Sequence, residues 1–286
     1  MRFAGLLAVL MLCVTPLAAQ AMWIPSSGDT FQWDLETPVP LTVPATVYDI
    51  DMFDNPATVV TKLHALGRHV ICYIDVGSWE SYRPDAKQYP KAILGERYPG
   101  YPQERFVDIR RLDLLGPILA KRFDLCRSKG FDAIEPDNID TYQADTGFPL
   151  TAQDELNFDA WLISQAHARG LSIGQKNDPE QASKLYGSFD WALLEECFYL
   201  NFCERFAPYV ASGKAVFDTE YVSDTGQHVF LNQDCPRNAQ QFRYYLILKR
   251  LALGSWIVTC NGQTWFGPES VLPLRHGHAG ATPRPH

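Results

Sequence analysis

Short apolar runs alternate with longer amphipathic stretches along most of the chain, a pattern typical of repeated strand–helix units around a parallel sheet. From these runs we predict eight strands: Thr46–Phe53, His69–Val76, Phe106–Ile109, Phe131–Pro136, Leu171–Gln175, Trp191–Glu196, Lys214–Thr219 and Tyr244–Lys249. Helical periodicity covers the segments Pro56–Leu66, Leu114–Lys129, Asp154–Arg169 and Pro179–Tyr186. Glycines stand where three of these helices should end, at Gly67, Gly130 and Gly170.

Eight strands favour one α/β domain, a (β/α)₈ barrel of the TIM type, over an open doubly wound sheet. A dinucleotide-binding sheet would place a G-x-G-x-x-G motif after its first strand, and none is present. We assign the barrel to residues 22–260, a length typical of such a domain.

Both ends of the chain differ from this pattern. Residues 1–21 carry Arg2, an apolar stretch from Gly5 to Val14 and the sequence Ala19-Gln20-Ala21, which together predict a cleaved secretory signal peptide. An uncut N-terminal membrane anchor is the alternative. Residues 261–286 are rich in Gly, Pro and His and predict a flexible tail. We therefore expect a secreted protein, extracellular or periplasmic, with no membrane association after cleavage.

The net charge of −8 argues against nucleic acid or an anionic membrane as a partner. A neutral or cationic ligand fits this charge better. Hydrophobic residues make up 46% of the chain, enough for a sizeable core, and we expect a monomer.

Six cysteines remain outside the predicted signal peptide, and an even number in an exported chain favours disulfides. Cys197 and Cys203 are close enough in sequence to close one loop. Cys235 and Cys260 would then join the flanks of the last strand, which leaves Cys72 with Cys126. Six cysteines allow 15 connectivities, so the pairing stays open. Zinc is disfavoured because no C-x₂-C pair and no suitably spaced His are present.

Carboxylates stand near the carboxyl ends of most predicted strands, which is where the active site of a parallel barrel lies. One such Asp often only caps the next helix. A cluster is costly unless it binds a cation or supplies paired carboxyls for catalysis, as glycoside hydrolysis requires. The candidate catalytic or substrate-binding residues are Asp49, Asp51, Asp75, Trp79, Glu135, Asp137, Asn138, Asp140, Lys176, Asn177, Glu195, Glu220 and Tyr221.

Aromatic side chains occupy the same loops. They either stack on sugar rings or cover the core, and the sequence does not decide between these roles. They are Trp79, Tyr82, Tyr101, Tyr142, Phe198 and Tyr199.

Two other site types fit poorly. Chitinase-like barrels carry D-x-x-D-x-D-x-E on the fourth strand, but here Ile139 stands in place of the acidic Glu. A metal-dependent hydrolase would need His among its ligands, and no His falls clearly at the carboxyl end of a predicted strand. We therefore predict no metal site.

Several motifs resemble glycoside hydrolase family 114, which contains endo-α-1,4-polygalactosaminidases. The resemblance runs from about Trp23 to Cys260. It is carried by Val47–Asp51, Ile71–Tyr73, Val76–Glu80, Asp108–Arg110, Gly130–Asp132, Glu135–Asn138, Lys176-Asn177 and Glu195-x-Cys197-Phe198. Asp75 departs from the family pattern, in which a small polar or neutral residue is frequent at this position.

The resemblance implies a TIM-like barrel that cleaves α-1,4-linked galactosamine polymers without a cofactor. It implies Asp137 and Glu195 as the catalytic pair, and by analogy with other retaining α-glycosidases Asp137 would be the nucleophile and Glu195 the acid/base. The expected partner is a cationic or partly deacetylated galactosamine-containing polysaccharide. Two alternatives remain, a non-catalytic barrel that binds aminosugar polymer and a glycosidase of another α-galactoside specificity.

Overall fold

The computed structural model describes residues 21–265. Its strands are β1 Phe31–Asp34, β2 Val47–Asp51, β3 His69–Asp75, β4 Ser78–Glu80, β5 Leu94–Arg97, β6 Glu104–Val107, β7 Ala133–Asp137, β8 Ser172–Lys176, β9 Trp191–Glu195, β10 Val216–Tyr221, β11 Tyr245–Lys249, β12 Ile257–Thr259 and β13 Thr264–Trp265. Its α-helices are α1 Ala57–Ala65, α2 Leu112–Lys129, α3 Ala152–His167, α4 Ala182–Leu185, α5 Ala207–Ala211, α6 Gln227–Val229 and α7 Cys235–Arg237.

Shorter helical turns complete the fold. The 3₁₀ turns are η1 Ala86–Gln88, η2 Lys91–Ile93, η3 Thr141–Gln143 and η4 Cys203–Phe206. Two π-helical segments, η5 Phe230–Asp234 and η6 Asn238–Phe242, alternate with α6 and α7. The predicted stop residues Gly67, Gly130 and Gly170 all have positive φ, as helix C-termini require.

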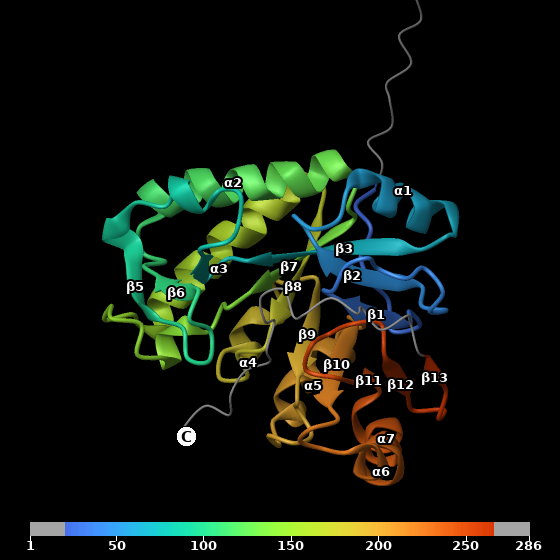
Figure 1. Cartoon of the computed structure of the whole chain (residues 1–286). Coiled ribbons are helices and arrows are strands. Elements are labelled where there is room, and N and C mark those ends of the chain that lie inside the picture. Colours follow the sequence, from blue (N-terminus) through green and yellow to red (C-terminus); the bar gives the residue numbers. More distant parts are fainter. Residues whose placement is uncertain (1–20, 266–286) are drawn as a thin grey trace, which may run out of the picture.

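The main sheet has the strand order β1-β2-β3-β7-β8-β9-β10-β11-β12-β13. Every pairing from β1 to β11 is parallel, and β12 and β13 add an antiparallel end. The sheet curls so that the chain just after β1 meets the chain after β11, where Leu35 N–H donates to Leu253 O at 2.8 Å. The long helices α1, α2 and α3 lie along the outside (Figure 1). The fold is therefore the predicted TIM-type barrel.

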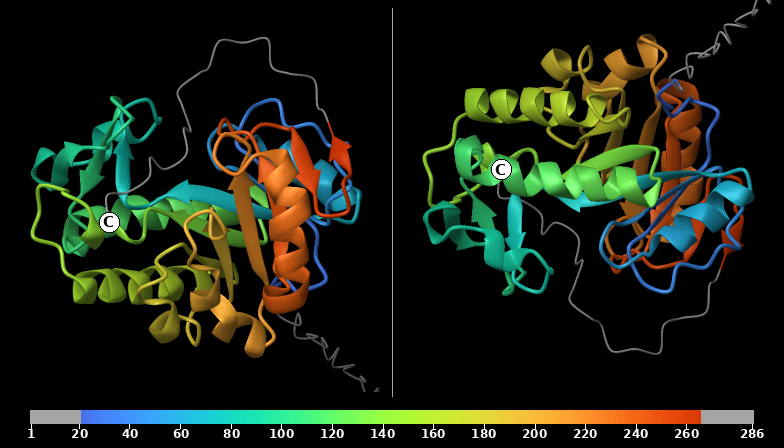
Figure 2. Two further views of the ribbon diagram at one scale, coloured as in Figure 1. Left: turned by 90° about the horizontal axis from the view of Figure 1, so that it is seen from below. Right: turned by 90° about the horizontal axis from the view of Figure 1, so that it is seen from above.

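One predicted barrel strand is wrong. The segment predicted as Phe106–Ile109 belongs to β6, which lies in a separate antiparallel sheet with the order β4-β6-β5. This small sheet stands at one side of the molecule, away from β1 and β11 (Figure 2). The missing parallel strand is β1, with the sequence Phe-Gln-Trp-Asp. All four of its residues are buried, including the polar Gln32 and Asp34. The strand therefore lacks the apolar run that predicts a buried strand.

The small sheet is fixed to the barrel by a buried ion-pair network. Arg83 contacts Asp51 at 2.6 Å, at the end of β2, and Glu80 at 2.8 Å, in β4. Arg122 of α2 donates to Asp75 O at 2.7 Å and pairs with Asp85 at 2.8 Å. These contacts hold the insertion against the carboxyl ends of β2 and β3.

Large aromatic side chains fill the barrel. Phe31 and Phe217 stack with ring centroids 4.5 Å apart, and Trp191 meets Phe217 edge-on at 5.9 Å. Gly174 makes room for Trp191, because a Cβ there would lie 2.7 Å from three atoms of the indole ring.

Gly174→Ala should therefore destabilise the protein by about 1–3 kcal/mol through overpacking. The matched control is Gly187→Ala, where an added Cβ would meet nothing within 4 Å. Denaturant unfolding of both variants checks this. Equal midpoints for the two variants would contradict the role given to Gly174.

The three disulfides pair as suggested by the sequence. Cys72 of β3 joins Cys126 of α2, Cys197 joins Cys203, and Cys235 of α7 joins Cys260 after β12. The first ties the barrel wall to its outer helix, and the second closes the loop that follows β9.

The two ends of the chain lie largely beyond the described part. Of the predicted signal peptide only Ala21 is described, and of the predicted tail only residues 261–265, which include β13. Among the described residues, no helix combines the length and the apolar character needed to cross a membrane.

Candidate active site

A buried lysine joins three carboxylates at the carboxyl end of the barrel. Lys176 Nζ, at the end of β8, lies 2.7 Å from Asp137 of β7, 3.1 Å from Glu195 of β9 and 3.2 Å from Glu135 of β7. It also lies 4.8 Å from the centroid of the Trp33 ring. Both predicted catalytic residues stand at the carboxyl ends of their strands, and both contact the same ammonium group.

These three carboxylates differ in how far their side chains are exposed to solvent. The side chains of Asp137 and Glu195 are 21% and 12% exposed, whereas that of Glu135 is 1% exposed. Asp49 is also fully buried. A substrate arriving from solvent can therefore contact Asp137 and Glu195, while Glu135 and Asp49 lie beneath them.

Tyrosine hydroxyls fix the two more accessible carboxylates, those of Asp137 and Glu195. Tyr73 donates to Asp137 Oδ2 at 2.9 Å, and Tyr221 donates to Glu195 Oε1. Burial raises the pKa of both tyrosines well above the ordinary value, and the adjacent carboxylates raise it further, so both hydroxyls keep their protons. They hold the two carboxylates in fixed orientations.

Asp137 is held in its ionised form. Burial alone would raise its pKa, but the Lys176 ammonium and the hydrogen bonds from Lys176 and Tyr73 lower it below the ordinary value. An ionised carboxylate fixed in this way can act as a nucleophile.

The pKa values of the more deeply buried carboxylates, Glu135 and Asp49, are raised instead of lowered. Burial raises the pKa of Glu135 to about 7, although Lys176 opposes the shift. The pKa of Asp49 is raised well above its ordinary range by burial and then by Glu135. Burial and the neighbouring Glu135 therefore both favour the protonated form of Asp49. Its burial favours a positioning role for it and for Glu135.

Asn138 links the end of β7 to its neighbours. Its backbone N–H donates to Asp137 Oδ1 at 2.9 Å, and its side chain donates to Asp75 at 3.0 Å. Asp75 also accepts the Ser78 hydroxyl at 2.5 Å. Gly77 allows this close packing, because a Cβ there would lie 1.9 Å from Asn138 O.

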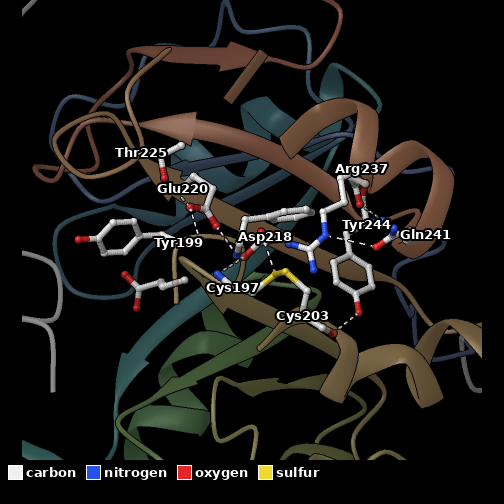
Figure 3. The surroundings of a disulfide bond; sticks show 12 residues. Cys197, Tyr199, Cys203, Asp218, Glu220, Thr225, Arg237, Gln241 and Tyr244 are labelled. Atoms are coloured by element: carbon white, nitrogen blue, oxygen red, sulfur yellow. Dashed lines mark hydrogen bonds between the residues drawn. A yellow bond between two sulfur atoms is a disulfide. The ribbon is translucent and has the colours of Figure 1, made fainter. Parts of the chain in front are cut away.

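The backbone around Glu195 is held by two further predicted residues. Asn177 Oδ1 accepts the Glu195 N–H at 2.9 Å. Glu220 accepts the N–H groups of Phe198 at 2.9 Å and Tyr199 at 3.3 Å, in the loop closed by the Cys197–Cys203 disulfide. Figure 3 shows Glu220 between this loop and Thr225. Glu220 thus shapes the loop that follows the catalytic strand.

Three other predicted site residues have different partners. Asp51 pairs with Arg83, and Trp79 donates its indole N–H to Ala86 O at 2.9 Å in the small sheet. Asp140 precedes η3 and lies near Glu155, whose pKa it raises. The structure does not bring these three to Lys176, and their binding of substrate stays a prediction.

Among the described residues, Cys197, Cys203 and Asp218 form the one group of three potential metal ligands close together. The two sulfurs are bonded to each other, so they are not free to bind an ion (Figure 3).

Comparison with known proteins identifies the family. The model of glycoside-hydrolase family GH114 matches residues 14–264. The crystal structure of Aspergillus fumigatus Ega3 in complex with galactosamine has 31% sequence identity and a TM-score of 0.75, and the match covers 85% of this chain and 99% of that one. The chain belongs to glycoside-hydrolase family GH114. It is therefore a glycoside hydrolase.

A more distant structural match supports the barrel fold alone. The glycoside hydrolase domain of PelA from Pseudomonas aeruginosa has 14% identity and a TM-score of 0.62, with 82% of this chain and 99% of that one covered. The chain matches none of the curated proteins searched.

Tyr73 and Trp33 contact residues of this site but were not among the predicted site residues. Tyr73 lies inside a predicted strand rather than after it, so it was counted as core. Trp33 lies in β1, which was not predicted as a strand. Alternation along β3 would have placed Tyr73 on the same face as Asp75. Tyr101 was considered only as a loop aromatic, yet the charges of Glu195 and Asp137 act on its hydroxyl.

Proposed function

We propose that this GH114 enzyme is an exported, endo-acting hydrolase that cleaves α-1,4-linked galactosamine polymers with retention of anomeric configuration. Asp137 is the nucleophile and Glu195 the general acid/base. Support for the substrate comes from Ega3, which was crystallised with galactosamine and is 31% identical to this chain. The acidic strand ends suit a polymer of ammonium-bearing sugars.

One observation carries the mechanism. The Asp137 and Glu195 oxygens contact the same Lys176 nitrogen at 2.7 and 3.1 Å, so they are separated by no more than the sum of these distances, about 5.8 Å. Retaining glycosidases hold their carboxyl groups about 5–5.5 Å apart and inverting ones about 6.5–9.5 Å. The bound fits the retaining arrangement and lies below the range of the inverting enzymes.

In the proposed first step, Asp137 attacks the anomeric carbon from the β face while Glu195 protonates the departing O4 of the next sugar. A covalent β-linked glycosyl-enzyme results. Glu195 then removes a proton from water, which displaces Asp137 from the α face. Lys176 and Tyr73 stabilise the Asp137 carboxylate when it leaves.

Incubation of the purified protein with a deacetylated α-1,4-galactosamine polymer should release oligosaccharides from the start of the reaction, as seen by mass spectrometry. Because the substrate is cationic, KM should rise with ionic strength. Intact polymer after incubation with a folded enzyme would contradict the proposed substrate. Release of monosaccharide alone would contradict endo action.

A further inference from the structure

The turn between β5 and β6 is fastened to the catalytic strand. The Tyr98 hydroxyl donates to Asn138 Oδ1 at 2.7 Å, and Asn138 is bonded through its N–H to Asp137. Within the turn, Tyr98 N–H donates to Glu104 O at 3.0 Å and Tyr101 N–H to Tyr98 O at 3.1 Å. The small sheet therefore holds Tyr101 and Glu104 beside Tyr98, which is itself one hydrogen bond from Asn138, the residue next to the nucleophile.

Glu104 lies among carboxylates at this position. The charges of Asp75, Glu80 and Asp137 all act on it, and it stands directly opposite Glu80 across the β4–β6 pair. Glu104 is buried, with 7% of the residue exposed. A sugar bound against Asp137 would therefore lie within the electrostatic reach of Glu104.

The neighbours of Glu104 have cationic partners, and Glu104 does not. Glu80 pairs with Arg83, and Asp137 pairs with Lys176. In the part of the chain from residue 21 to 265, no Lys, Arg or His nitrogen lies within 4.0 Å of the Glu104 carboxylate. Its hydrogen bond from Tyr82 is long, at 3.3 Å, because that hydroxyl lies closer to Glu80, at 2.6 Å.

We propose that Glu104 binds the ammonium group of a galactosamine unit seated beside Asp137, and so selects the free aminosugar over its N-acetylated form. This assignment rests on the proposed function. An ammonium group supplies the positive charge and the hydrogen-bond donors that the Glu104 carboxylate lacks in the protein. A neutral acetamide supplies one donor and no charge.

Ligand binding at Glu104 should release a proton. Burial, followed by the charges of Asp75, Glu80 and Asp137, raises the pKa of Glu104 to about 9, so its carboxyl is protonated in the empty site at pH 6. The facing groups are Asp75 from β3, Glu80 and Tyr82 from the β4 side, and Asp137 from β7. An incoming ammonium favours the carboxylate, and the displaced proton leaves to solvent.

Titration calorimetry measures both the selectivity and the proton. The probes are the α-1,4-linked galactosamine trisaccharide and its fully N-acetylated form, titrated at pH 6 into a Glu195→Gln background that leaves them uncleaved. Repeating each titration in buffers of different ionisation enthalpy gives the number of protons released. With Glu104 present, we expect about one proton per galactosamine trisaccharide and none for the acetylated one.

Glu104→Gln should abolish proton release and weaken galactosamine binding at least about tenfold, while binding of the acetylated probe changes less than about twofold. Glu104→Asp should keep proton release, which separates a lost charge from a lost fold. Glu204→Gln, at an exposed glutamate of η4, should behave as the parent. Unchanged proton release in Glu104→Gln would overturn the assignment. So would an equal loss of binding affinity for the galactosamine and the acetylated trisaccharide.

These titrations do not depend on bond cleavage. A wild-type enzyme that fails to cleave the polymer would contradict the proposed function, whereas the Glu104 comparison would still report whether this carboxylate binds the ammonium.

Discussion

Asp137→Asn and Glu195→Gln should each reduce cleavage of the galactosamine polymer by at least about a thousandfold, the usual effect of removing a group that acts in covalent catalysis. The amide of Asn cannot form the glycosyl ester, and Gln at position 195 can neither protonate the leaving O4 nor activate water. Both substitutions keep the side-chain shape and the hydrogen bonds from Tyr73 and Tyr221.

Initial rates of reducing-end formation on the polymer measure this effect. The matched controls are Asp145→Asn and Glu204→Gln, which neutralise exposed carboxylates of the same kinds. The controls should retain wild-type rates and unfolding midpoints, and circular dichroism of the two catalytic variants should show the wild-type secondary structure. Near-wild-type turnover in either catalytic variant would remove that residue from the mechanism.

Lys176→Met should damage both stability and activity. Lys176 contacts three carboxylates, so its loss leaves Glu135, Asp137 and Glu195 without their shared cation. Breaking a buried ion pair from one side typically costs about 3–5 kcal/mol. Urea unfolding at pH 7 measures the change, with Lys184→Met as the exposed control.

The same substitution should shift the pH profile in a defined direction. The pKa of Asp137 is depressed in the folded enzyme because Lys176 outweighs burial, so the carboxylate stabilises the fold above its unfolded pKa. This stabilisation is lost as pH falls through the folded value. Without Lys176, burial dominates and the pKa rises, so the acidic limb of kcat/KM should move to higher pH. An unmoved limb would mean that another group sets the ionisation of Asp137.

Strongly patterned elements could be predicted from the sequence. β3 and α1 have clear apolar periodicity, and the structure places them within a residue of the predicted bounds. β1 could not be found, because a four-residue strand with Gln and Asp at buried positions lacks the usual alternation. β6 was recognised as a strand but assigned to the barrel, since a local sequence does not say which sheet a strand joins.

The sequence predicted which residues converge at the site but not how deeply each of them is buried. The structure brings Asp137, Lys176 and Glu195 together, as expected from the convergence of the carboxyl ends of parallel strands. The catalytic roles of Asp137 and Glu195 came from the family resemblance and stay predictions. Glu135 stands two residues before Asp137 on the same face, and only the assembled barrel shows that it lies deeper. Glu220 was grouped with Tyr221, although neighbouring strand residues point to opposite faces and only Tyr221 contacts Glu195.

The most direct test of the central claim is the anomeric configuration of the glycosyl azide that azide-rescued variants form. The substrate is an aryl α-galactosaminide oligomer, whose activated leaving group needs no protonation. Asp137→Ala with azide should give the β-glycosyl azide, because azide replaces the nucleophile and inverts the centre once. Glu195→Ala with azide should give the α-glycosyl azide, because azide intercepts the glycosyl-Asp137 intermediate and inverts it again. Proton NMR gives the configuration of each azide. An α-azide from Asp137→Ala and a β-azide from Glu195→Ala would mean that the two residues have exchanged roles. A β-azide from both variants would contradict a covalent, retaining mechanism.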